Sequence, residues 1–334
     1  MEKSSGGASL GRRKVNVQLR ALCVVAAVLS AALCGCISIG FKEQRISTVT
    51  VERSGRFFEP NRIAIIDIDG FIGSGSAPWW MIGGTSVAEV KEKLERARWD
   101  RRVQAVVLRV NSPGGEVGAS DIIYEELQRF RRETGKPVVA CCMDVAASGG
   151  YYVACGTDRI VASPTTVTGS VGVIMHLTNV EGLFGKIGLQ SVTIKSGAKK
   201  DIGSPTRMMT AEEREIMERL MQGMFKRFVG VMRTAHPAVT DADAAIIGDG
   251  RVFGADEALQ LHMIDRIGYL RDAIEEAASL ARISAADVIL YQKVPAATSN
   301  IYAQWGPAMA LGEGLNALLR RQGPAFLYLW TPAQ

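Results

Sequence analysis

Four apolar runs in the first half of the chain are long enough for buried strands, and polar turns bound each of them. We predict strands at residues 62–70, 103–110, 137–143 and 159–162. Val87, Val90 and Leu94 recur at helical spacing within residues 86–98, and a second helical segment spans residues 119–134. Strands that alternate with helices in this way are typical of a parallel sheet with crossover helices. The pattern therefore predicts an α/β fold.

The second half of the chain is predicted to be mainly helical. A capping-box pattern, Thr210-Ala-Glu-Glu213, starts a long helix that runs to about residue 234. Shorter helices are expected at residues 241–247, 255–261 and 270–281, and strand-like runs at residues 171–175, 191–195 and 324–330. We divide the chain into an N-terminal segment (1–40), a linker (41–61), one globular domain (62–282) and a C-terminal tail (283–334).

The N-terminal segment has the composition of a membrane-targeting sequence. Residues 21–40 contain no charged side chain and are mostly apolar, and several basic residues precede them. About 20 apolar residues span a bilayer as a helix, and basic residues before them keep the N-terminus in the cytoplasm. We predict either an uncleaved signal anchor or a lipoprotein signal peptide that ends at Leu33-Cys-Gly-Cys36, with Cys36 acylated. Either version tethers the globular domain to the extracytoplasmic side of the cell membrane.

Composition narrows the possible functions. The 334 residues are 47% hydrophobic and 22% charged, and the formal net charge of +5 lies partly in the first 20 residues. No basic stretch is interleaved with aromatic residues, so nucleic-acid binding is not expected. The six cysteines form no CxxC pair and no Cys/His spacing that suits zinc. We therefore expect buried free thiols, no metal and no other cofactor.

Two glycine-rich turns follow predicted strands, at Asn111-Ser-Pro-Gly-Gly115 and at Asp144-Val-Ala-Ala-Ser148-Gly-Gly. Ligands bind outside the carboxyl ends of parallel strands, so these turns are expected to be neighbours across one cleft. Ser148 lies among small residues at the start of a predicted helix, where free amides can stabilise an oxyanion. The sequence leaves two interpretations open, a serine nucleophile or a helix N-cap without chemistry.

A serine nucleophile needs a base, and the chain offers few candidates. Of the three histidines, His176 lies just after a strand-like run, whereas His236 and His262 lie near helix ends. A lysine can replace histidine only when neutral, which requires the site to lower a pKa that is ordinarily about 10.4. The pair Lys199-Lys200 supplies such lysines, and Thr168-Gly-Ser170 could supply a hydroxyl that orients the amine.

Five motifs occur in the order in which a known family has them: Asn111-Ser-Pro-Gly-Gly115, Ala147-Ser-Gly-Gly-Tyr-Tyr152, Thr168-Gly-Ser-Val-Gly-Val173, Ser196-Gly-Ala-Lys-Lys-Asp201 with Ser204-Pro205, and Asp249-Gly-Arg-Val-Phe253. Together they resemble the bacterial signal peptide peptidases of the SppA type, in the short form with a single catalytic domain. The resemblance covers about residues 60–282. It implies the ClpP/crotonase-like fold, in which repeated β-β-α units build a twisted sheet.

The resemblance also implies roles for individual residues in a Ser/Lys dyad. Ser148 is the nucleophile, Lys200 the general base, and Ser170 hydrogen-bonds the lysine amine. The backbone amides of Gly114 and Gly149 are the oxyanion donors. The dyad is shared between protomers of a homo-oligomeric ring, an octamer in short forms. The neighbouring Lys199 leaves the identity of the base open by one residue.

We therefore expect a membrane-anchored serine endopeptidase that hydrolyses apolar, extended peptides such as remnant signal peptides. Two alternatives remain at this stage. One is an acyl-CoA enzyme of the crotonase kind, in which the Asn111–Gly115 turn supplies the oxyanion hole. The other is a catalytically idle scaffold that assembles a membrane partner. The role of the C-terminal tail is also open: it packs on the ring or occupies the cleft as an inhibitory or processed segment.

Overall fold

The computed structural model describes residues 46–53, 61–74, 84–293 and 326–329, all of which belong to one compact unit formed by residues 45–334. Its main sheet has the strand order β1-β11-β2-β4-β5-β6-β10. All neighbours from β11 to β10 are parallel, and β1 is antiparallel to β11. The strands are β1 (Ile46–Glu52), β11 (Asp287–Lys293), β2 (Arg62–Gly73), β4 (Val103–Glu116), β5 (Val138–Ala147), β6 (Arg159–Ala162) and β10 (Arg266–Ile267).

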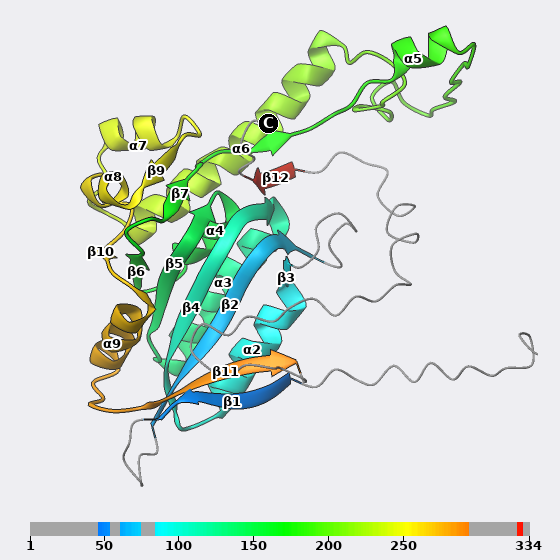
Figure 1. Cartoon of the computed structure of the whole chain (residues 1–334). Helices are drawn as coiled ribbons and strands as arrows, with labels where there is room; N and C mark the ends of the chain where they lie inside the picture. The colour runs from blue at the N-terminus through cyan, green and yellow to red at the C-terminus, as the bar shows by residue number, and fades with distance from the viewer. Residues whose placement is uncertain (1–45, 54–60, 75–83, 294–325, 330–334) are drawn as a thin grey trace, which may run out of the picture. The chain divides into compact units, whose positions relative to one another are not determined.

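Helices cover both faces of this sheet (Figure 1). One face packs against α2 (Val87–Trp99), α3 (Val117–Thr134) and α4 (Gly149–Ala154), and the other face packs against α9 (Leu270–Leu280). Successive residues of a strand point to opposite faces. In β2, accordingly, Ala64 and Ile66 join the α2–α4 side of the core, whereas Ile63 and Ile65 join the α9 side. The predicted parallel α/β sheet with crossover helices is confirmed.

A second group of elements extends the sheet at the carboxyl ends of β2, β4 and β5. It contains the strands β3 (Gly84–Ser86), β7 (Val167–Gly169), β8 (Ile174–Met175), β9 (Val252–Gly254) and β12 (Phe326–Leu329). Its helices are α6 (Ala211–Ala235), α7 (Asp241–Ile247) and α8 (Ala255–Gln260). Strand β7 is parallel to the end of β5 and antiparallel to β9. The sheet is therefore mixed, and its antiparallel pairs other than β1–β11 lie beside the two glycine-rich segments.

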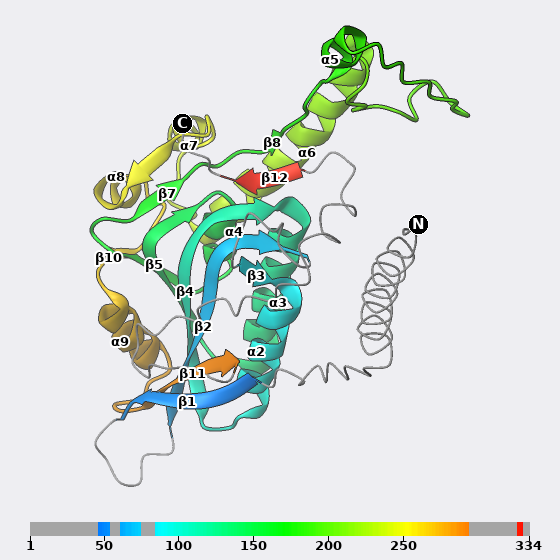
Figure 2. The same ribbon diagram turned by 45° about the vertical axis from the view of Figure 1, so that its right-hand side comes forward.

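Residues 176–210, which include α5 (Glu181–Lys186), form an arm that lies beyond the N-terminal end of α6 and away from the sheet in both views (Figures 1 and 2). The strand predicted at residues 191–195 does not form. The prediction is wrong because Val192 and Ile194 are 83% and 96% exposed, with no neighbouring strand to pair with in the described part of the chain. The apolar side chains of residues 191–195 are therefore not buried in a single copy.

The sheet extends past the predicted limits of the globular domain. Strand β1 comes from the predicted linker, and β11 and β12 come from the predicted tail. The predicted membrane-targeting segment and Cys36 lie outside the described residues. Across residues 46–53, 61–74, 84–293 and 326–329, no helix has the length and apolar character needed to span a bilayer.

Candidate active site

Ser148 lies at the junction of β5 and α4, in a backbone conformation that serine rarely adopts. Its φ is 51° and its ψ is −115°. Positive φ in a residue other than glycine costs of order 1–3 kcal/mol and persists only where the surroundings impose it. Ser148 takes the N-cap position of α4, yet its side chain makes no capping hydrogen bond. The structure thus disfavours the N-cap interpretation and matches the strained strand-to-helix turns that carry nucleophilic serines.

The structure brings Ser148 and Ser170 together in one cavity of about 300 Å³. The Ser148 amide donates to the carbonyl oxygen of Gly169 at 2.7 Å, and the Ser170 amide donates to that of Arg251 at 2.7 Å. Ser170 also has a positive φ of 51°. Two serines in strained backbone conformations therefore face the same small space.

The other walls of this cavity come from three segments. They are the residues after Ser170 up to Ile174, one side of α6, and the Gly248–Gly250 turn. The α6 side contributes Met221, Gln222 and Phe225, which sequence reasoning did not identify. Met221 and Phe225 are four residues apart on a helix, so the sequence could have shown that both lie on the same face. The cavity thus has both apolar side chains and polar ones, among them Gln222 and Asp249, beside the two hydroxyls.

The two glycine-rich segments lie side by side, as predicted, but they are not turns: residues 111–115 belong to β4 and residues 144–147 to β5, so both strands run further than the sequence predicted. Ser112 pairs with Ala146 in the β4–β5 register, and a Cβ atom at Gly150 would lie 2.7 Å from the Ser112 carbonyl oxygen. Gly149 is the first residue of α4, and amides of a first helical turn lack acceptors within the helix. The Gly114 amide instead donates to the Ser112 hydroxyl at 3.1 Å. That amide must leave Ser112 before it can bind an oxyanion.

A segment of the chain's own C-terminal region pairs with the edge of β4 beside this site (Figure 1). Strand β12 runs antiparallel to Gly114–Glu116 of β4 on one side and to β8 on the other. Leu329 pairs with Gly114, the predicted oxyanion donor, and Leu327 pairs with Ile174 of the cavity wall. The edges of β4 and β8 therefore accept an extended strand next to Ser148.

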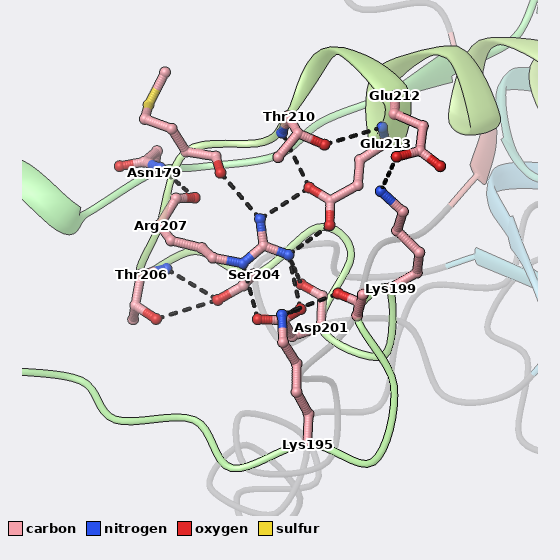
Figure 3. Close-up of polar contacts among 12 residues, drawn as sticks. Asn179, Lys195, Lys199, Asp201, Ser204, Thr206, Arg207, Thr210, Glu212 and Glu213 are labelled. Carbon is pink, nitrogen blue, oxygen red and sulfur yellow. Dashed lines mark hydrogen bonds and ion pairs between the residues drawn. The ribbon is translucent and has the colours of Figure 1, made fainter.

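Lys200 lies on the arm and is exposed, and it does not line the Ser148 cavity. Within the described residues its amine has no hydrogen-bond or ion-pair partner. The Lys199 amine contacts a carboxylate oxygen of Glu212 at 2.5 Å (Figure 3). In a single copy, the predicted base Lys200 is thus separate from the predicted nucleophile Ser148. The alternative base, Lys199, is engaged in an ion pair.

No histidine lines the Ser148 cavity. His176 is exposed at the start of the arm, and His262 is exposed after α8. His236 is buried at the end of α6, where desolvation lowers its pKa. A histidine base for Ser148 is therefore not supported by the geometry.

The described cysteines have no redox or metal-binding arrangement. Cys141, Cys142 and Cys155 are buried and free, and burial raises the pKa of Cys141 and of Cys155 to about 12. Thiols held in the neutral form are poor nucleophiles and poor metal ligands. No group of three or more potential metal ligands occurs within the described ranges.

Comparison with known proteins connects this geometry to a family. The profile of Peptidase family S49 matches residues 130–284, and a Clp protease profile matches residues 84–167. The chain is 34% identical over 226 residues to a candidate signal peptide peptidase SppA of Enterococcus faecium, across 67% of this chain and 64% of that protein. It is 35% identical over 233 residues to Protease 4 of Salmonella typhi, across 70% of this chain and 37% of that protein.

A candidate protease of Synechocystis sp. is 34% identical over 220 residues, which are 66% of this chain and 74% of that protein. The chain thus spans less than two thirds of the Enterococcus faecium and Salmonella typhi relatives, but almost three quarters of the Synechocystis one. The Clp protease match agrees with the mixed α/β sheet described above. On these matches, the chain belongs to peptidase family S49 and is an SppA-type member with a Clp-protease-like α/β fold.

Proposed function

We propose that the chain is a membrane-anchored serine endopeptidase that hydrolyses apolar peptides, such as remnant signal peptides, with a Ser148/Lys200 dyad. One observation carries the proposal. Ser148 is held at φ 51° without a capping bond and faces, together with Ser170, a cavity that both apolar and polar residues line. A strained backbone at a strand-to-helix junction costs free energy, and such strain is typical of residues whose orientation matters for catalysis, such as a nucleophile.

The reaction begins when the Ser148 hydroxyl attacks the carbonyl carbon of the scissile peptide bond and gives its proton to the neutral amine of Lys200. The amides of Gly149 and Gly114 stabilise the oxyanion, the latter after releasing Ser112. The C–N bond then breaks, and the leaving amine takes the proton from Lys200. Water, deprotonated by the same lysine, hydrolyses the acyl-enzyme and restores the Ser148 hydroxyl.

The separation of Ser148 from Lys200 within one copy supports a shared site. A lysine amine accepts a proton only when neutral, and burial favours the neutral form. Lys200 is exposed in a single copy, so we propose that the arm of one protomer docks beside the Ser148 cavity of the next. There Ser170 would accept or donate a hydrogen bond to the amine. The family resemblance suggests a closed ring, an octamer in short forms.

The surface of the arm fits this arrangement. Leu183, Ile187, Val192 and Ile194 are all more than half exposed on residues 176–210. Exposed apolar side chains gathered on one segment mark an interaction surface. A second copy is the proposed partner because the same contact would complete the dyad.

The substrate is proposed to bind as an extended strand. Strand β12 already pairs with β4 and β8 beside Ser148, which supports the ability of these edges to hold a peptide backbone. Main-chain hydrogen bonds of this kind give affinity with little sequence preference, and pockets for side chains add selectivity. Met221 and Phe225, the apolar side chains that α6 contributes to the cavity, favour an apolar side chain of the substrate.

Membrane attachment is proposed from the sequence of residues 21–40, which lie outside the described residues. The two versions, an uncleaved signal anchor and an acylated Cys36, both place the peptidase domain on the extracytoplasmic side. They differ in the mass of the mature N-terminus. Intact mass spectrometry of protein purified from membranes distinguishes them.

The proposed function is tested with the full-length chain and a fluorogenic apolar peptide. We expect hydrolysis by the wild type, covalent labelling of Ser148 by a peptidyl phosphonate, and loss of both in Ser148→Ala. Ser279→Ala, which changes an exposed serine on α9, is the matched control and is expected to behave as wild type.

Two results would contradict the peptidase assignment, and a third would contradict the role of Ser148. Absence of hydrolysis and of labelling in the wild type would favour the idle scaffold. Calorimetric binding of an acyl-CoA by a chain that hydrolyses no peptide would favour the crotonase-like alternative. Undiminished turnover by Ser148→Ala would remove Ser148 as the nucleophile.

A further inference from the structure

The guanidinium group of Arg207 joins two carboxylates at the base of the arm (Figure 3). Its Nε and Nη2 donate to the two Asp201 oxygens at 2.8 and 2.7 Å. Its Nη2 and Nη1 donate to the two Glu213 oxygens at 2.6 and 2.8 Å. The remaining donor capacity of Nη1 goes to the Met208 carbonyl at 3.0 Å. Paired two-point contacts of this kind fix both distance and orientation, which a single ammonium cannot do.

Both carboxylates depend on this arginine. The side chains of Asp201 and Glu213 are only 11% and 2% exposed. Hydrogen bonds from Arg207 lower the pKa of Asp201 and bring that of Glu213 down to about 2. The same contacts raise the pKa of Arg207 above its usual range. All three groups are therefore charged at neutral pH, and removal of Arg207 would take an ion-pair partner from both carboxylates, with Lys195 left to pair with Asp201.

The Arg207 contacts connect the loop that carries Lys200 to the first turn of α6. Glu213 is the third residue of α6 and forms a reciprocal capping box with Thr210. Asp201 directly follows Lys200 and also accepts from the Lys195 amine at 2.5 Å. Lys199, on the other side of Lys200, contacts Glu212. Asp201, the residue after Lys200, is thus anchored through Arg207, while the Lys200 side chain stays exposed.

Helix α6 is in turn fixed to the part of the chain that holds Ser148. Phe228 packs edge to face on Tyr152 of α4, with ring centroids 4.9 Å apart. The Arg227 Nε donates to Asp121 of α3 at 2.8 Å. Glu213 precedes the cavity-lining Met221 by eight residues of one helix, about 12 Å along its axis. A rigid helix therefore joins the Lys200 loop to the cavity region of the same chain.

We propose that Arg207 is a positioning residue for Lys200, acting through Asp201 and Glu213 to hold the Lys200 loop against α6 so that the amine reaches the Ser148 site of a neighbouring copy. The inference rests on the proposed function, because it assigns Lys200 the role of base. Arg207 touches neither substrate nor Ser148 and contributes by geometry alone. A displacement of about 1 Å at a reacting group can cost about 10²-fold in rate.

Mixed assemblies test this inference. Two full-length chains with different tags are co-expressed and isolated by both tags. A Ser148→Ala chain supplies an intact Lys200, and a Lys200→Ala chain supplies an intact Ser148. The reference mixture is expected to hydrolyse the peptide because some junctions combine the two intact residues.

Arg207→Gln is then placed in one chain or in the other. In the chain that supplies the lysine, we expect kcat to fall about 10²-fold with little change in KM. In the chain that supplies the serine, we expect no loss, because the arm of that chain already lacks Lys200. Arg207→Lys keeps the positive charge but lacks the two-point hydrogen bonds of the guanidinium group, and it is expected to give an intermediate kcat. Arg132→Gln, which removes an exposed Arg–Glu pair on α3, is the matched control and is expected to leave kcat unchanged.

Equal losses in both placements would overturn the inference, since they would show a general effect on folding or assembly. Absence of any loss would also overturn it. An inactive reference mixture beside an active wild type would refute the shared dyad, and with it this role of Arg207, while the peptidase function would stand.

Hydrogen exchange of residues 195–204 tests, independently of activity, whether Arg207 holds the Lys200 loop in place. Faster exchange in Arg207→Gln than in Arg132→Gln supports the positioning role, and unchanged exchange overturns it. A wild type that hydrolyses no peptide refutes the proposed function, and the exchange result then still shows whether Arg207 holds the loop.

Discussion

The amide of Ser148 donates to the carbonyl oxygen of Gly169 at 2.7 Å, and both residues have positive φ, 51° and 90°. The bond joins the β5–α4 turn to β7, so the strained serine is held by a neighbouring strand as well as by its own helix. A Cβ atom at Gly169 would lie 2.5 Å from the Phe253 ring, which excludes other residues there. The conformation of Ser148 is thus imposed by its surroundings, as strained functional residues require.

Replacement of Ser148 by glycine separates strain from chemistry. Ser148→Ala and Ser148→Gly both remove the hydroxyl, but only glycine adopts positive φ without cost. Relief of strain of about 1–3 kcal/mol should outweigh the roughly 0.4–1 kcal/mol that glycine costs through the unfolded chain. We expect both variants to be inactive and Ser148→Gly to have the higher free energy of unfolding in urea titration. A more stable Ser148→Ala would show that this backbone is not strained.

Lys199→Ala and Lys200→Ala distinguish the two adjacent candidates for the base. Loss of a general base typically reduces rate by about 10²–10⁴-fold. We expect that loss for Lys200→Ala, whose amine is exposed and unbound in the described structure. For Lys199→Ala we expect less than about a tenfold change, because an exposed ion pair such as Lys199–Glu212 contributes little. Steady-state hydrolysis rates measure both, and the reverse order would assign the base to Lys199.

Gly115 and Gly118 form a pair of glycines with opposite expectations. A Cβ atom at Gly115 would lie 2.0 Å from the Ile72 carbonyl oxygen, whereas one at Gly118 would meet nothing within 4 Å. Gly115→Ala must push β4 from β2 and is expected to cost about 3 kcal/mol, the upper end of overpacking effects. Gly118→Ala, in α3, is expected to be neutral or to stabilise by up to about 1 kcal/mol. Urea unfolding of both variants measures the difference, and similar stabilities would contradict the close approach.

Local patterns were sufficient to predict the central strands β2, β4, β5 and β6 and the position of Ser148. The apolar runs before Asn111 and Asp144 are nearly continuous, so the glycine-rich segments after them could be placed next to each other, although both belong to β4 and β5 and not to turns as predicted. Thr210 and Glu213 likewise predicted the start of α6, which the capping box confirms. In each case the signal lies within a few residues of the feature.

Features that depend on distant partners could not be predicted in the same way. The residues of β12 pair with β4 and β8 from more than 150 positions away, and no periodicity specifies such a partner. Val192 and Ile194 have the composition of a buried strand but are exposed on the arm, because apolar character does not say whether the covering surface belongs to the same copy. Arg207 was missed because its partners are six residues away on either side, a spacing that marks no regular element.

The Arg207 contacts give the arm a defined response to acid. Hydrogen bonds from Arg207 lower the pKa of Glu213 from 4.5 to about 2. A depressed carboxyl pKa contributes stability that is complete above the usual value and is lost as pH falls through the lowered one. We expect protection of residues 195–213 from hydrogen exchange, corrected for intrinsic rates, to decline between pH 4.5 and pH 2.

Glu213→Gln provides the control for this response. Its neutral amide cannot form the ion pair, so exchange of the same residues should already be fast at pH 7 and should change little down to pH 2. Equal pH dependence in the wild type and in Glu213→Gln would assign the acid response to other groups.

Strand β12 occupies the edges at which we propose that substrate binds, so its removal should affect peptide affinity. A chain that ends at Gly323 lacks β12, whereas a chain that ends at Leu329 retains it and is the matched control. Substrate must displace β12 in the control but not in the shorter chain. We expect kcat/KM of the shorter chain to be higher by roughly tenfold, which corresponds to about 1.4 kcal/mol of competing strand pairing, with the change mainly in KM. Equal kcat/KM for the two chains would show that peptides bind elsewhere, and a lower value for the shorter chain would make β12 a structural part of the site.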